Sequence, residues 1–90
     1  MPTRTVAVAS RVGLHARPAA LFTQAVTAAG IPVTIATAGH PPVNAASILM
    51  VMALGVPHGQ DVTLAAEGDG ADRVLDELAE LLATDLDATA

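Results

Sequence analysis

Apolar residues occupy every second position in three short stretches of this chain, which is the period of a strand with one buried face. The stretches and their apolar positions are residues 5–10 with Val6 and Val8, residues 32–37 with Val33 and Ile35, and residues 59–66 with Val62, Leu64 and Ala66. After a turn at Ala38 and Gly39, a shorter strand is expected near Val43. The alternation therefore predicts four strands.

Three further stretches have the composition and spacing of helices. These helices are expected at residues 18–29, 44–54 and 71–83, and residues 84–90 are expected to fray. Pro18 favours a first turn, whereas Gly30 and Gly55 favour helix ends. Asp69 is the expected N-cap of the last helix. The apolar faces of the first and last helices consist of Ala19, Phe22, Val26 and Ala29, and of Val74, Leu75, Leu78, Leu81 and Leu82.

The order of these elements, β-α-β-β-α-β-α, predicts an α+β fold with two layers. Four half-apolar strands and three one-sided helices are best buried with the helices on one face of a largely antiparallel sheet. The chain has 90 residues, which suits one small domain and is too short for two. We therefore expect a single domain over residues 1–90.

The middle helix contains seven consecutive apolar residues, 48–54. In a helix, Met50, Val51 and Leu54 would share one face, and Ile48, Leu49 and Met52 would share the opposite face. Because both faces cannot point into the same two-layer core, one is expected to be exposed and to serve as a docking site for another protein. A short buried strand is the alternative for this run.

Charge is distributed unevenly along the chain. The net charge is −5, yet residues 1–60 contain no acidic residue, and all nine acids lie in residues 61–90. This distribution predicts an acid-free surface around the first sixty residues, and such a surface can attract an anion. Without lysine, and with Phe22 as its single aromatic residue, the chain is a poor candidate for binding nucleic acid. No apolar run is long enough for a membrane span, and no signal peptide is recognisable, so a cytoplasmic location is expected.

The stretch GLHARPAA, residues 13–20, places His15 and Arg17 at the expected start of the first helix. A helix N-terminus offers free N–H groups and the positive end of the helix dipole, and it binds phosphate. A guanidinium can hold two phosphate oxygens at once, and an imidazole is a competent nucleophile near pH 7. The pattern favours a phosphate-accepting histidine. The alternative is that His15 only caps the helix and Arg17 is an ordinary surface residue.

Other chemistry has less support. The chain has no cysteine, so disulfides and thiolate metal sites are excluded. His40 and His58 are expected in solvent-facing loops, and no carboxylate precedes Asp61 to complete a metal site with them. We expect neither a metal nor a cofactor. One nucleophile, one arginine and no neighbouring acid or base indicate a carrier rather than an enzyme.

The motif GLHARPAA, the segment NAASILMVMALG at residues 44–55 and the element order resemble HPr, the histidine-containing phosphocarrier of the bacterial phosphoenolpyruvate-dependent sugar phosphotransferase system. The resemblance covers about residues 5–83. It implies an open-faced β-sandwich, in which three helices cover one face of a four-stranded antiparallel sheet of order 1-4-2-3. It also implies that His15 accepts a phosphoryl group on Nδ1 from enzyme I and passes it to enzyme IIA domains. Arg17, with Ala16 and Pro18 beside it, would stabilise the phosphate. The implied docking surface comprises Ile48, Leu49, Met52, Ala20 and Leu21.

The resemblance further implies a regulatory serine at Ser47, which an HPr kinase/phosphorylase modifies in some bacteria. The expected helix start at Ser47 would favour a phosphate there, although serine is also a common N-cap. The chain departs from many members at Ala46, where they carry a lysine, and at Gln24, Thr27 and Met50, where they carry basic residues.

Two alternatives to a monomeric carrier stay open from the sequence. The first is a regulatory paralogue that uses His15 or Ser47 to control transcription or nitrogen metabolism. The second is a small interaction module of similar layering in which His15 is only a cap.

Overall fold

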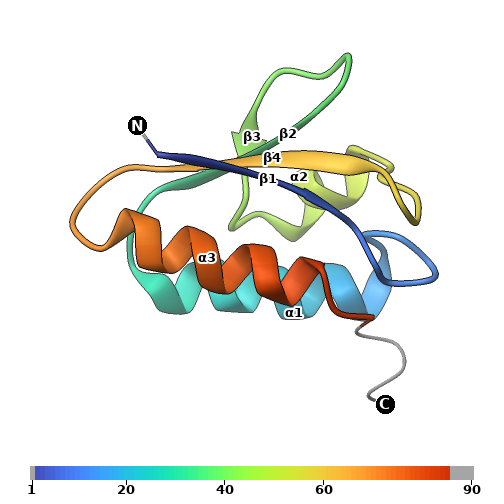
Figure 1. The fold of residues 1–90 in the computed structure, drawn as a ribbon. Helices are drawn as coiled ribbons and strands as arrows, with labels where there is room; N and C mark the ends of the chain where they lie inside the picture. The colour runs from blue at the N-terminus through green and yellow to red at the C-terminus, as the bar shows by residue number, and fades with distance from the viewer. Residues whose placement is uncertain (1, 86–90) are drawn as a thin grey trace.

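The computed structural model describes residues 2–85. Its elements are β1 (Thr3–Ala7), α1 (Ala16–Ala29), β2 (Val33–Thr37), β3 (Val43–Asn44), α2 (Ile48–Ala53), β4 (Asp61–Ala66) and α3 (Ala71–Leu82). The strands form one antiparallel sheet in the order β1-β4-β2-β3. Helices α1 and α3 run side by side beneath this sheet, and its other face is open (Figure 1). The α+β class and the element order predicted from the sequence, and the strand order implied by the resemblance, are confirmed.

Alternation along the central strand β4 decides which face of the sheet is covered. Val62 and Leu64 are buried, whereas Asp61 and Thr63 are exposed. Leu64 pairs with Ile35 of β2, so two large apolar side chains lie next to each other on the helix side. Phe22 of α1 is fully buried below them. A shift of one residue in strand register would expose this apolar face, which is why the pattern specifies the pairing.

Several element boundaries differ from the sequence prediction, most of them by one or two residues and the start of α2 by four. Strand β1 starts at Thr3 and ends at Ala7, although Val8 beyond it is buried and donates its N–H to the carbonyl of Gln60. Helix α2 starts at Ile48 rather than residue 44, because the Ala45 N–H donates to the Val33 carbonyl and prolongs the contact with β2.

The expected capping of α3 by Asp69 is wrong. The N-cap is Gly70, which has a φ of 79°, and no side chain makes a capping hydrogen bond there. Without a cap, the helix is held by its buried apolar stripe, which includes Val74, Leu75 and Leu78.

The tertiary structure also changes the interpretation of the charge distribution. Strand β1 lies over α3, so Arg4 reaches Asp76 at 2.8 Å and Asp72 at 3.2 Å. The hydrogen bond that Arg4 donates to Asp76, followed by the one to Asp72, raises the pKa of Arg4 above its usual value. Arg11 pairs with Asp85 at 3.1 Å. Of the three arginines in the first sixty residues, Arg17 alone has no carboxylate partner within residues 2–85.

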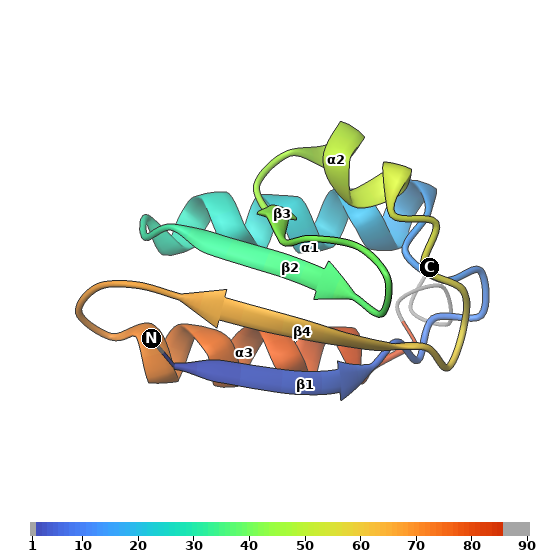
Figure 2. The ribbon, with the colours of Figure 1, turned by 90° about the horizontal axis from the view of Figure 1, so that it is seen from above.

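Helix α2 lies beside α1 at the β3 edge of the sheet (Figure 2). Val51 is fully buried and Leu54 is 8% exposed, whereas Leu49 is 79% exposed. The predicted division into two faces is wrong for both methionines: Met50, grouped with Val51 and Leu54, is exposed, whereas Met52, grouped with Ile48 and Leu49, packs partly against the core. Helix α2 has only six residues. Which of its side chains are buried therefore depends on the neighbouring segments of the chain rather than on an extended helical stripe. The run 48–54 is a helix and not a buried strand.

Candidate functional site

His15 occupies the N-cap position of α1 in an extended conformation, with φ −125° and ψ 158°. Its side chain is exposed and makes no capping hydrogen bond. Nor does it form any hydrogen bond or ion pair with another described residue. The alternative in which the imidazole serves as a helix cap is therefore wrong. The ring is left with a lone pair that an incoming group can reach.

The helix N-terminus beside His15 has unused hydrogen-bond donors. The N–H groups of Ala16 and Arg17 have no acceptor within residues 2–85, whereas the Ala19 N–H points to the His15 carbonyl at 3.5 Å. Pro18 is buried, has no N–H, and holds the first turn in a helical φ. The exposed Arg17 guanidinium projects from the same turn without a carboxylate partner. Free N–H groups, the helix dipole and an unpaired cation together suit an oxyanion.

The backbone is strained between His15 and Arg17. Ala16 has a φ of 45° and is the single non-glycine residue with a positive φ among residues 2–85. A left-handed conformation at a residue with a Cβ costs on the order of 1–3 kcal/mol and persists only where the surroundings enforce it. Such strain is concentrated at functional sites. It sets the direction in which the chain enters α1 and hence the placement of His15.

Gly13 and Leu14 anchor the segment that carries His15, a role that the sequence analysis did not assign. The Leu14 N–H donates to the Val56 carbonyl at 2.9 Å, and the Leu14 side chain is fully buried. Gly13 has a φ of 73°, and a Cβ there would lie 2.1 Å from the Val56 oxygen and 2.9 Å from the Pro57 Cα. The loops before α1 and before β4 therefore lie against each other at one end of the molecule (Figure 2). The signal in the sequence was a glycine directly before a large apolar residue in the loop that precedes the first helix.

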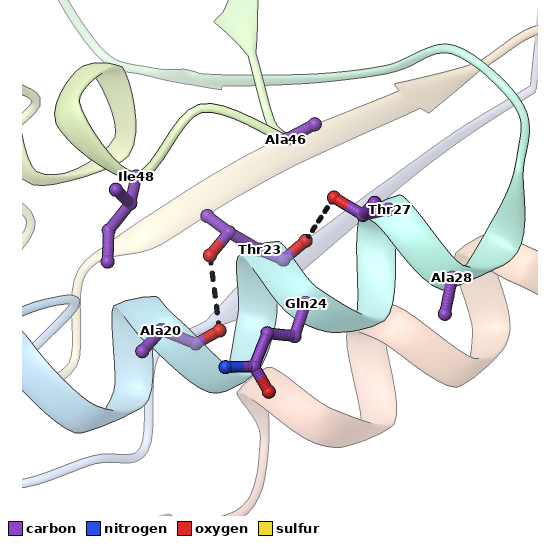
Figure 3. A pocket seen from close by; sticks show the side chains of 7 residues that line it. All are labelled: Ala20, Thr23, Gln24, Thr27, Ala28, Ala46 and Ile48. Atoms are coloured by element: carbon purple, nitrogen blue, oxygen red, sulfur yellow. Dashed lines mark hydrogen bonds between the residues drawn. The ribbon is translucent and has the colours of Figure 1, made fainter.

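A shallow hollow of about 400 Å³ lies between α1 and the start of α2 (Figure 3). Its lining residues are Ala20, Thr23, Gln24, Thr27, Ala28, Ala46 and Ile48. The hydroxyls of Thr23 and Thr27 donate to carbonyls of α1 itself. No charged side chain lines the hollow, which is why it suits an apolar contact better than an ion.

The expected docking residues are only partly gathered around this hollow. Ile48 lines it and is 38% exposed, and Leu49 beside it is 79% exposed. Ala20 also lines the hollow but is half-buried. Leu21 and Met52 are half-buried and belong to no described part of its lining. The large apolar side chains that α2 exposes are therefore Ile48, Leu49 and Met50, and of the expected docking residues only Ile48 and Leu49 are among them.

Ser47 is the N-cap of α2. Its Oγ accepts a hydrogen bond from the Met50 N–H at 3.3 Å, and the residue is half-buried. The interpretation of Ser47 as a cap is confirmed.

The other two histidines lie in loops. Both are exposed as expected, but His58 is not a free solvent-facing side chain, because its Nδ1 lies 3.2 Å from the Ser10 carbonyl oxygen. No group of three or more potential metal ligands occurs in the part of the chain that the structure describes. None of the described helices is long and apolar enough to cross a membrane.

Comparison with known proteins gives one consistent result. The family model described as the phosphorylation site of the HPr component of the phosphotransferase system matches residues 2–84. The phosphocarrier protein HPr of Streptomyces coelicolor is 49% identical over 87 residues, which cover 97% of this chain and 94% of that protein. A crystal structure of HPr from Thermoanaerobacter tengcongensis superposes with a TM-score of 0.85 at 38% identity, with 91% of each chain covered.

An HPr dimer from the same organism, at 38% identity, has a TM-score of 0.68 and covers 90% of this chain and 92% of that chain. The matched region contains the exposed histidine, the helix N-terminus and the unpaired arginine described above. The chain therefore belongs to the HPr family, whose members are phosphocarriers of the phosphotransferase system rather than enzymes.

Proposed function

We propose that this protein is a single-domain, monomeric phosphocarrier of the cytoplasm, and that Nδ1 of His15 carries the phosphoryl group. Phosphorylated enzyme I is the donor, and histidines of enzyme IIA domains are the acceptors. The observation that carries this proposal is an exposed imidazole without intramolecular partners, placed beside the free N–H groups and unpaired guanidinium at the start of α1.

Transfer onto the protein is an in-line displacement at phosphorus. The Nδ1 lone pair of His15 forms the new N–P bond while the bond between phosphorus and the donor breaks, and the electron pair of that bond stays with the donor. The proton remains on Nε2 of His15. Arg17 can donate two N–H groups to two phosphoryl oxygens, and the Ala16 and Arg17 amides lie at the positive end of the helix dipole. Transfer to the acceptor is the same displacement in reverse.

A carrier has to present the same atom to two different proteins. The exposure of His15 and Arg17 supports this, as do the exposed apolar side chains of Ile48 and Leu49. We propose that the partners dock over Ile48 and Leu49, with smaller contributions from Ala20, Leu21 and Met52, and supply the remaining groups for transfer. With two of the first three arginines already paired to carboxylates, apolar contact rather than charge attraction would dominate this docking.

The experiment is labelling with isotopic phosphoenolpyruvate and catalytic enzyme I. The wild type should take up one acid-labile phosphoryl group, His15→Ala should take up none, and His40→Ala, which changes an exposed loop histidine, should behave as the wild type. Arg17→Lys should be labelled more slowly, because an ammonium cannot contact two phosphoryl oxygens in the same way. Label on His15→Ala would overturn the assignment to this residue, and failure of the wild type to label would favour an interaction module.

We also propose that Ser47 is a target of an HPr kinase/phosphorylase. Its partial exposure next to Ile48 and Leu49 supports an effect on docking, because a phosphate there would add about two negative charges to an apolar surface. Incubation with kinase and ATP should give an acid-stable label on the wild type and on His15→Ala but not on Ser47→Ala. An acid-stable label that persists in Ser47→Ala would refute this role. Acid-stable labelling at Ser47 without acid-labile labelling at His15 would indicate the regulatory paralogue.

A further inference from the structure

One side chain of the loop between α2 and β4 contacts the segment that carries His15. His58 is exposed at the surface, yet its Nδ1 lies 3.2 Å from the Ser10 carbonyl oxygen. A carbonyl oxygen accepts and never donates, so this contact is a hydrogen bond only when Nδ1 of His58 carries the hydrogen. His58 is thereby fixed as the donor.

The acceptor of this bond belongs to the turn that precedes His15. Ser10 is 2% exposed, and its carbonyl also accepts the Gly13 N–H at 2.9 Å, which closes the turn from Ser10 to Gly13. Leu14 then leaves the turn and is bonded to Val56. The His58 ring therefore supports one end of this turn, and the backbone of its own loop supports the other.

We infer that His58 is a positioning residue for phosphoryl transfer at His15, an inference that rests on the function proposed above. The strained Ala16 φ of 45° needs a rigid approach to α1. The backbone bonds from Gly59 to Val8 and from Leu14 to Val56 hold the chain on both sides of the turn. His58 adds a side-chain donor to the turn itself. It does not touch the phosphoryl group but limits the directions in which the His15 ring is presented.

The test uses three substitutions that differ in where a donor remains. His58→Asn places an amide N–H near the former Nδ1, His58→Gln places it farther out near the former Nε2, and His58→Ala removes it. The loss of one hydrogen bond of ordinary net strength should lower kcat for phosphorylation by enzyme I about threefold to tenfold in His58→Ala and His58→Gln. KM for the carrier should stay unchanged, because Ile48 and Leu49 are untouched. His58→Asn should restore kcat, and His40→Ala is the matched histidine control.

Hydrogen exchange of the Gly13 amide provides a second readout that does not depend on phosphoryl transfer. We expect faster exchange in His58→Ala and His58→Gln but not in His58→Asn. The inference would be overturned if kcat were the same in all variants, or if all three substitutions at His58 lowered it equally. A change confined to KM would also overturn it, because such a change would indicate direct contact with the partner. If the wild type is not labelled at all, the proposed function fails, and unchanged Gly13 exchange in His58→Ala would then separately refute the positioning role.

Discussion

Replacement of Gly13 by alanine tests how the segment before His15 is held. The new Cβ would lie 2.1 Å from the Val56 carbonyl oxygen, and real Cβ atoms do not approach backbone atoms so closely, so one of the two loops has to move. Forcing extra volume into a packed site costs about 1–3 kcal/mol, and a left-handed alanine adds roughly 1–2 kcal/mol. Gly13→Ala should therefore lose about 2–5 kcal/mol in free energy of unfolding.

Gly39→Ala is the matched control for this prediction. Gly39 has a φ of 85°, but nothing lies within 4 Å of the position that a Cβ would take there. This variant should lose only the conformational part, about 1–2 kcal/mol. Urea denaturation of both variants gives the difference, and the rate of labelling by enzyme I should fall in Gly13→Ala alone, since that loop carries His15. Equal destabilisation of the two variants would refute the reasoning from close approach between the loops.

Two further predictions concern the elements around the site. Arg4→Gln should lower the urea midpoint in low salt. Because the pairs with Asp72 and Asp76 are exposed, the difference from the wild type should shrink in about 1 M NaCl, where the screening length falls to about 3 Å. A difference that does not depend on salt would contradict an electrostatic role. Ser47→Ala should cost about 0.5–2 kcal/mol of unfolding free energy through loss of the α2 cap, whereas Ser47→Asn should retain most of the stability. Equal losses in the two Ser47 variants, measured by thermal unfolding, would exclude capping as the cause.

The layered architecture could be predicted from local patterns. Alternation in residues 59–66 placed Val62 and Leu64 on the buried face, and the stripe containing Val74, Leu75 and Leu78 placed α3 against it. These predictions succeeded because each depends on the period of one element, which a sequence states directly. The start of α2 was predicted four residues too early, because the Ala45 contact with Val33 comes from a strand far away in the sequence.

The candidate site shows the same division. The sequence alone placed a histidine, an arginine and a proline at a helix start, a pattern that favours a phosphate site, but it left open that His15 only caps the helix and that Arg17 is an ordinary surface residue. The tertiary structure decided which charges remain available: the sheet brings Arg4 onto α3 and Arg11 to Asp85, which leaves Arg17 unpaired among the three N-terminal arginines in the described residues.

The tertiary structure also decided how the loop before His15 is held. Besides the bond between Ser10 and Gly13, the turn is held by His58 and Val56 of the loop before β4, more than forty residues later in the chain. The physical reason is that period and propensity act between neighbours in the sequence, whereas ion pairs and close backbone approaches depend on which segments the fold brings together.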